Sequence, residues 1–142
     1  MKPPLAIIDT NVVVSGVLTA LSASPTVRIL DAMLRGGFRF LLSIELLAEY
    51  RAVLLRTKIR SRHRLSEREI DVLLAEIATN GVVVESESPM TGEDVRQDVH
   101  LWRLLAREPS AVLVTGDKRL FSHPAGKARV LMPREFADLL EE

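Results

Sequence analysis

The sequence predicts an α/β fold with a mainly parallel sheet, and three observations support this prediction. Short, continuously apolar segments alternate along the chain with longer segments in which apolar residues recur at helical intervals. Continuous apolar strands, rather than alternating ones, are typical of parallel sheets covered by helices on both faces. Two of the apolar segments, 5–8 and 111–115, lead into an aspartate. Because ligands of such folds bind beyond the carboxyl ends of the strands, we expect a site there.

Capping residues and helical periodicity define the elements of the first half of the chain. Ser24 followed by Pro25 is typical of a helix start, and Ser43 precedes a second amphipathic stripe. The elements expected from these signals are a strand over 5–8, a helix starting near 12, a helix over 24–37, a short strand or connector over 38–42, and a helix over 43–56.

The second half of the chain continues the alternation of strands and helices. Ser66 and Glu69 have the spacing of a capping box, and Asn80-Gly81 marks the end of the helix that they open. The elements expected there are a helix over 66–80, a strand over 82–85, a turn-rich loop over 86–93, a helix over 95–107, strands over 111–115 and 129–132, and a terminal helix from 133. With no repeat, linker or low-complexity segment, 1–142 is expected to be a single domain.

The composition excludes several classes of function. Lys+Arg and Asp+Glu both number 19, so the formal net charge is zero and any contact with nucleic acid must come from a local patch. The absence of cysteine excludes thiol catalysis, disulfides and zinc–thiolate sites. No apolar run approaches the roughly 18 residues of a membrane span, and no secretory signal pattern opens the chain. A cytoplasmic protein without membrane contact is expected.

Two acids lie at predicted strand ends. Asp9 directly follows the strand over 5–8, and Asp117 follows the strand over 111–115 after one glycine. Since the carboxyl ends of parallel strands meet at one edge of a sheet, both carboxylates are expected at the same edge.

Two helical acids are positioned to join them. Glu49 lies on the border of the apolar stripe of the helix over 43–56, whereas Glu45 points further into solvent and is the weaker candidate. Asp98 shares a helix face with Leu101 and Leu105, which places it on the buried side in the first turns. The favoured set is therefore Asp9, Glu49, Asp98 and Asp117.

Four converging carboxylates require compensation, because they cannot all remain ionised in a half-buried cleft. Divalent cations would neutralise them. Oxygen-only ligation with open positions suits Mg²⁺ or Mn²⁺ rather than zinc. Such ions activate water, stabilise a departing oxygen and hold a phosphodiester in line, so the pattern indicates metal-dependent phosphodiester hydrolysis.

The chain resembles the PIN domains, specifically the toxin-type ribonucleases of bacterial and archaeal toxin–antitoxin pairs, in "IIDTNVVVSG", "SIELLAEYRAVL" and "AVLVTGDKRLF". The resemblance runs nearly end to end. It implies a three-layer α/β/α sandwich with a parallel sheet of five strands and Mg²⁺- or Mn²⁺-dependent cleavage of RNA. It further implies an antitoxin protein as partner, and frequent dimers. The residues implied as metal-binding acids are Asp9, Glu49, Asp98 and Asp117, with Asn11 and Thr115 as polar neighbours.

Two positions depart from the pattern of that family. Val95 stands where members often carry an acid three residues before the third carboxylate, and Arg119 stands where many carry an acid two residues after the last one. These departures predict a weaker second metal site, or one that forms only when a substrate phosphate supplies ligands.

Each site residue also has a purely structural interpretation. Asp9 suits a helix cap, Glu49 a solvated helix position, Asp98 a partner of the helix dipole, and Thr115 a turn. The three histidines, His63, His100 and His123, show no ligand spacing, and His100 is expected at the surface.

A basic run between two predicted helices is the remaining motif. Residues 56–64, "RTKIRSRHR", carry five basic side chains and His63. Such a run is usually a solvated turn. On a net-neutral protein it is also the best candidate for contact with the RNA backbone, through Lys58, Arg60, Arg62 and Arg64.

Two other classes of α/β protein carry an acid at a strand end, and the sequence lacks what each requires. A response-regulator receiver would need an adjacent acidic pair at the end of the first strand, and a haloacid-dehalogenase-type phosphatase would need an acid at position 11, which is Asn11. The alternative that remains is a PIN fold that binds RNA or a protein without cutting.

Overall fold

The computed structural model of the chain describes residues 2–85, 99–122 and 129–140. Within them, five short parallel strands form the centre of the fold, with β4 between β1 and β5 and with β2 paired to β3. A parallel bridge between Ala6 and Phe40 links the two groups in the order β3-β2-β1-β4-β5. The strands are β1 (Ala6–Ile8), β2 (Leu41–Leu42), β3 (Val82–Val83), β4 (Val112–Val114) and β5 (Val130–Leu131).

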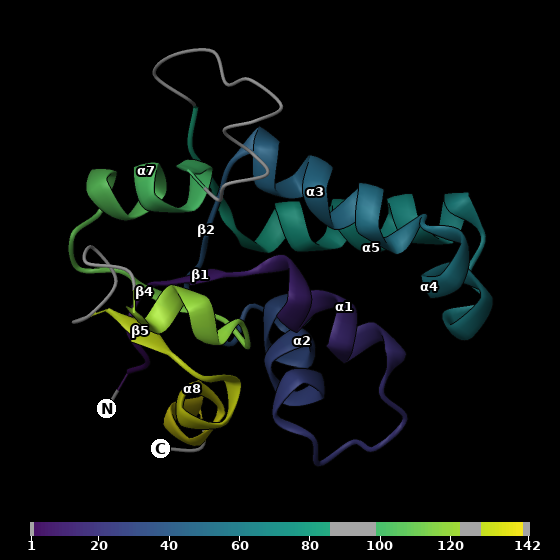
Figure 1. The fold of residues 1–142 in the computed structure, drawn as a ribbon, viewed down its shortest axis with the longest axis horizontal. Helices are drawn as coiled ribbons and strands as arrows, with labels where there is room; N and C mark the ends of the chain where they lie inside the picture. Colours follow the sequence, from purple (N-terminus) through teal and green to yellow (C-terminus); the bar gives the residue numbers. More distant parts are fainter. Residues whose placement is uncertain (1, 86–98, 123–128, 141–142) are drawn as a thin grey trace.

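Helices cover both faces of these strands (Figure 1). On one side lie α1 (Thr10–Leu18), α2 (Pro25–Arg35) and α8 (Pro133–Leu140). On the other side lie α3 (Ile44–Leu54), α5 (Glu67–Asn80) and α7 (Val99–Arg107), and the remaining described helices are α4 (Thr57–His63) and the short 3₁₀ helix η1 (Lys118–Ser122). The three-layer, parallel α/β fold predicted from the sequence is confirmed.

The predicted caps account for where several helices begin and end. Ser43 Oγ accepts a hydrogen bond of 3.0 Å from the Leu46 amide, and Ser66 and Glu69 form a reciprocal capping box. Ser24 occupies the N-cap of α2, although its side chain makes no capping bond there. Gly36 ends α2 in the left-handed region at φ 70°, a conformation that favours glycine.

The core lies between the strands and both helical layers. Ile7, Ile8 and Leu113 are completely buried, as are Phe40 and Phe136 from the flanking elements. Each such side chain contributes about 1.5–3 kcal/mol through burial. The central strands β1 and β4 therefore lie in the core of the fold, and their carboxyl ends lie side by side.

The basic run over 56–64 is a helix rather than the turn expected from its charge. Helix α4 occupies most of it, with Arg64 as C-cap at φ 60°. On one face Ile59 packs against the core, and His63 Nε2 lies 2.9 Å from the Leu54 carbonyl oxygen. The charged side chains therefore point in different directions around a helix, and they do not act as one flexible group.

Helices α1 and α2 approach each other closely at Gly16. A Cβ added at Gly16 would lie 2.8 Å from the Thr26 carbonyl oxygen and 2.9 Å from Leu30 Cβ, so α1 and α2 meet where no side chain fits.

None of the helices formed by the described residues is long and apolar enough to cross a membrane.

Candidate active site

Asp9 lies where β1 passes into α1, and it is held from three directions. Its side chain is only 5% exposed. Oδ1 accepts a hydrogen bond of 2.8 Å from the Thr10 amide, as an N-cap of α1. Oδ2 accepts bonds from Thr115 Oγ1 at 2.7 Å and from Asn11 Nδ2 at 3.0 Å. The cap interpretation of Asp9 is thus correct for one of its oxygens, while the other faces the end of β4.

Thr115 joins the two strand ends. It is completely buried, and its hydroxyl donates to Asp9 and accepts from Asn11 Nδ2 at 3.2 Å and from the Asp117 amide at 3.0 Å. Asn11 Oδ1 in turn accepts a bond of 3.0 Å from the Gly116 amide. One donor and two acceptor positions of the hydroxyl are all used, so the orientation of the Asp9 carboxylate is fixed.

Glu49 reaches the site from α3 and is held by two side chains. Thr10 Oγ1 donates a hydrogen bond to Oε1, and His100 Nε2 lies 3.2 Å from Oε2. Thr10 therefore links the two acids, because its amide binds Asp9 and its hydroxyl binds Glu49. The border position predicted for Glu49 places it beside the end of β1.

Asp117 follows β4 and is paired with Arg119. The guanidinium donates from Nη2 to Oδ2 at 2.6 Å and from Nε to Oδ1 at 3.1 Å, and the Arg119 amide also donates to Oδ1 at 3.0 Å. The Arg119 hydrogen bonds lower the pKa of Asp117 below its ordinary value of 3.8. The carboxylate is therefore ionised and already compensated.

The pKa values of the other two acids are shifted in opposite directions. Burial raises the pKa of Asp9 above its ordinary value of 3.8, against the opposing hydrogen bonds from Thr115 and Thr10, and the charge on Glu49 raises it further. Burial also acts to raise the pKa of Glu49, but the hydrogen bonds from His100 and Thr10 outweigh it, and that pKa is lowered. The ionised carboxylate of Asp9 is therefore less well stabilised by its neighbours than the ionised carboxylate of Glu49.

Tyr50 lies directly beneath these acids. It is completely buried, and its hydroxyl donates to the Ile8 carbonyl oxygen at the end of β1. Burial, followed by the charges of Asp9 and Glu49, raises the pKa of Tyr50 well above its ordinary value of 10.0. The phenol therefore remains a neutral donor that holds the strand end in place.

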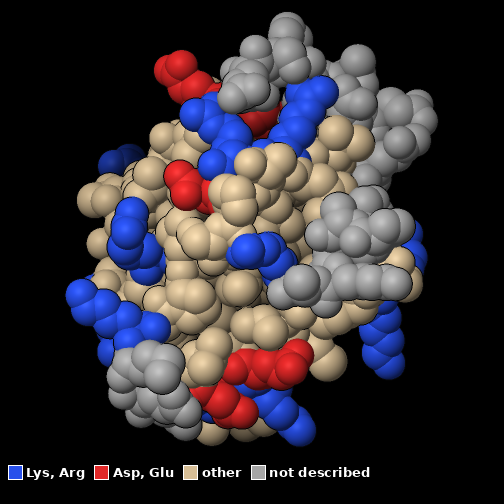
Figure 2. Space-filling view, turned by 90° about the vertical axis from the view of Figure 1, so that its left-hand side faces the viewer, with Lys and Arg blue, Asp and Glu red and all other residues tan. Residues whose placement is uncertain are grey.

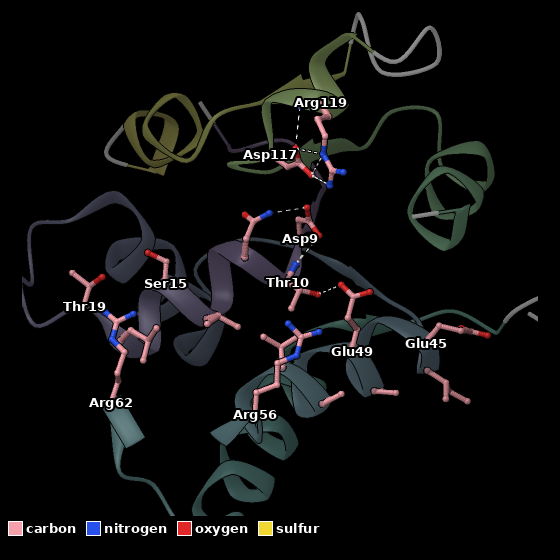
Figure 3. Close-up of a pocket in the computed structure, with 17 residues that line it drawn as sticks. Asp9, Thr10, Ser15, Thr19, Glu45, Glu49, Arg56, Arg62, Asp117 and Arg119 are labelled. Carbon is pink, nitrogen blue, oxygen red and sulfur yellow. Dashed lines mark hydrogen bonds and ion pairs between the residues drawn. The ribbon is translucent and has the colours of Figure 1, made fainter. Parts of the chain in front are cut away.

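A cleft brings together the three predicted site acids that the structure describes. Its volume is about 1210 Å³, and Asp9, Glu49 and Asp117 all line it, together with Glu45 and Arg119 (Figure 3). Asp98 and Val95 lie outside the described residues. Among the described residues, no group of three or more carboxylate or imidazole side chains is close enough to hold a metal ion.

Two expectations from the sequence were wrong. His100 is not at the surface but is 1% exposed, because it lies on the buried stripe of α7 one turn before Leu104. That spacing could have identified it. Glu45 is half-buried rather than solvent-facing, with one carboxylate oxygen excluded from solvent. It points away from Asp9 and Glu49 all the same (Figure 3).

The basic run contributes to the cleft through one side only. Of its basic residues, Arg56 and Arg62 line the cleft, whereas Lys58, Arg60 and Arg64 are not among the residues lining it. On the face that Figure 2 shows, the Lys and Arg side chains form small separate groups, some of them beside Asp or Glu side chains, and no continuous basic surface. The cleft is therefore the better place to look for a binding surface than that face.

The chain belongs to the PIN domain family, whose sequence pattern matches residues 6–119. This range contains all four acids predicted from the sequence. PIN domains are generally nucleases and typically use divalent metal ions. Comparisons with curated proteins and with solved structures gave no match.

The donor set fits such an ion. Asp9 and Glu49 offer hard oxygen ligands linked through Thr10, which suits Mg²⁺ or Mn²⁺. Asp9, whose pKa is raised by burial, is stabilised by any cation that replaces the missing compensation. Asp117 presents oxygens to the same cleft, but these are occupied by Arg119.

Proposed function

We propose that the protein is a Mg²⁺- or Mn²⁺-dependent ribonuclease. The observation that carries this proposal is the buried Asp9, which lies at the end of β1 in one cleft with Glu49 and Asp117. Membership of the PIN domain family supports the same reaction class. The expected substrate is RNA, cut at its phosphodiester bonds.

The acids would hold the ion, and their neighbours would hold the acids. Asp9 and Glu49, with Asp98 and Asp117, are the proposed ligands. A bound ion supplies an activated water and a positive charge at the departing oxygen. Thr115 and Asn11 orient Asp9, while Thr10 and His100 keep Glu49 ionised. The protein contribution is therefore a preoriented carboxylate pair.

The products distinguish this reaction from attack by the ribose. In hydrolysis, a water oxygen bonds to phosphorus, the bond to the 3′ oxygen breaks, and that oxygen leaves with a proton. The fragments carry 5′-phosphate and 3′-hydroxyl ends. Attack by the 2′-hydroxyl would instead leave a cyclic phosphate and a 5′-hydroxyl.

The deciding experiment uses end-labelled single-stranded RNA with Mg²⁺, Mn²⁺ or excess EDTA. Wild type is expected to cut only with metal, and Asp9→Asn and Glu49→Gln are expected to lose nearly all cleavage. Glu76→Gln, an exposed acid on α5, is the matched control and is expected to cut normally. Cleavage in excess EDTA, or normal cleavage by Asp9→Asn, would contradict the proposal.

A second function is favoured by one observation. Because Arg119 occupies the carboxylate of Asp117, the domain is also suited to bind RNA or a protein without cutting it. In the same assay this alternative predicts a shift of labelled RNA in a native gel with no product under any metal condition.

The biological role proposed here rests on the resemblance to toxin-type members of the family. We propose that the chain is the toxin of a toxin–antitoxin pair, active in the cytoplasm, with an antitoxin protein as partner and a homodimeric state. Induced expression is expected to arrest bacterial growth, and Asp9→Asn is expected to relieve the arrest. Equal arrest by both forms would contradict a toxin that acts by cleavage.

A further inference from the structure

We propose that Arg56 and Arg62 form a second subsite in the cleft, which binds a backbone phosphate of single-stranded RNA beside the carboxylate site. This inference rests on the proposed function and names the form of its substrate. Of the basic run over 56–64, it assigns only these two side chains to contact with RNA.

The lining of the cleft selects these two arginines from the basic run. Ile59 packs against the core, and Arg62 follows it by three residues, so both project from neighbouring positions of one helix face. Arg56 is the N-cap residue, and its carbonyl oxygen accepts a bond of 2.8 Å from the Arg60 amide. Both arginines line the cleft, as does Thr19, the C-cap residue of α1 (Figure 3).

The subsite and the acids share one continuous cleft. Arg56 lies close enough to Glu49 for its charge to act on that carboxylate, and in the close-up it stands on the Glu49 side of Arg62 (Figure 3). The cavity of about 1210 Å³ exceeds the roughly 300–1,000 Å³ of ordinary small-molecule pockets. A polymer segment that spans more than one nucleotide is therefore a better occupant than a small molecule.

The charges of the cleft require such cations. Carboxylates repel the phosphates of a substrate, so binding needs positive side chains near the acids. Arg119, on the opposite rim, is already paired with Asp117. Guanidinium groups bind phosphate oxygens through two parallel hydrogen bonds, and both arginines of the subsite have exposed side chains.

The apolar part of the cleft lining favours a single strand over a duplex. Besides the acids and the arginines, the lining includes apolar side chains from α1 and α3: Val14, Leu18, Ala48, Ala52 and Val53. These side chains offer contact to the faces of bases that are not stacked on one another. In an A-form duplex the base faces are hidden in the stack, so only a single strand can use this surface.

The test compares two double variants that remove the same charge from the same run. Arg56→Gln with Arg62→Gln alters the subsite, whereas Lys58→Gln with Arg60→Gln alters exposed positions outside the cleft. Binding of a short fluorescent single-stranded RNA is measured by anisotropy in EDTA over a range of salt concentrations. Melting temperatures verify that both variants fold.

The subsite variant is expected to bind more weakly, and its log–log salt slope is expected to be flatter by about 0.7, the value for one lost phosphate contact on a single strand. The control variant is expected to keep the wild-type slope. Unlabelled duplex RNA is expected to compete less well than the unlabelled single strand.

Equal losses in both variants, or none in the subsite variant, would overturn the subsite, and equal competition by the duplex would overturn the single-strand preference. Failure of the proposed function is seen separately, because absent cleavage with metal leaves this binding measurement intact. Conversely, normal cleavage with an unchanged salt slope would reject the subsite alone.

Discussion

The Arg119 guanidinium donates hydrogen bonds to both carboxylate oxygens of Asp117, at 2.6 Å to Oδ2 and 3.1 Å to Oδ1. The pair stands at the carboxyl end of β4, where the resemblance to toxin-type nucleases leads one to expect a second acid in place of the arginine. Because the Arg119 side chain is 84% exposed, the pair stabilises the fold by at most about 1 kcal/mol. A metal ion can displace it but must compete with it.

Arg119→Gln is therefore expected to tighten the binding of Mn²⁺, by up to about fivefold for an exposed ion pair. Calorimetric titration of metal-free protein at pH 7 measures this. Arg60→Gln, which removes an equal charge outside the cleft, is the control and is expected to leave the affinity unchanged. If both variants tighten binding equally, the effect is one of net charge and not of the pair.

Asp9 is expected to weaken the metal-free fold as pH rises. Its folded-state pKa is raised by burial, so its favourable contribution is present below the ordinary value of 3.8 and is lost as pH climbs from that value through the folded one. The melting temperature of wild type relative to Asp9→Asn should thus be highest below pH 3.8 and should decline toward pH 7. Thermal melts in EDTA at several pH values test the sign.

A bound metal ion should restore the stability that the fold loses when Asp9 ionises. At a hundredfold excess over its dissociation constant, a single bound ion adds about 2.7 kcal/mol to the free energy of unfolding. Wild type at pH 7 is expected to gain more than Asp9→Asn. The expectation would be contradicted if both proteins gained equally from metal and their difference in melting temperature did not change with pH. Asp9 would then be neither destabilised by burial of its charge nor a ligand of the ion.

Thr115→Val is expected to lower the free energy of unfolding by about 1–3 kcal/mol, because it leaves the buried Asp9 carboxylate and the Asp117 amide short of a partner. Valine keeps the shape of threonine, so packing is preserved. For a chain of this size each kcal/mol corresponds to about 2–4 °C in melting temperature. Thr79→Val, at an exposed position of α5, is the control and should stay within about 0.5 kcal/mol of wild type.

His100→Leu is expected to raise the pKa of Glu49. The lowered pKa of Glu49 contributes stability above the ordinary value of 4.5, and that contribution is lost as pH falls through the folded value. Without the His100 bond, the opposing effect of burial dominates, and metal binding should weaken at a higher pH than in wild type. Carbon-13 NMR titration of the Glu49 carboxyl measures the shift directly.

A matched histidine separates this effect from general loss of stability. His63 bonds only to backbone groups, the Leu54 carbonyl oxygen and the Leu65 amide, among the contacts described for it. His63→Leu is therefore expected to leave the Glu49 titration in place. Should the Glu49 pKa stay fixed in His100→Leu, then His100 merely fills space beside it.

The sequence predicted best what depends on local patterns. Continuous apolar runs identified β1 and β4, and the serines at 43 and 66 identified helix starts, because a strand face and an N-cap are both decided by neighbours in the chain. The acids at positions 9 and 117 could be placed at one edge since parallel strands share their direction.

What could not be predicted depends on distant partners. The bond from Thr10 to Glu49 and the pairing of Arg119 with Asp117 require side-chain geometry that no spacing specifies. The basic run was wrongly expected to be a turn, because its charges hid the weak apolar face of Ile59 that anchors α4. The surface position predicted for His100 is wrong, because its place within an apolar helical stripe outweighs the usual exposure of histidine.

Pairing of β1 with β4 has a consequence for the order of events during translation. Asp9 is made first, and Thr115, whose hydroxyl binds it, is added 106 residues later. Until then a nascent chain carries Asp9 without the partners at the end of β4 that complete its surroundings. If the protein cuts RNA as proposed, the ribosome has read its message past the codon of Thr115 before the site is assembled.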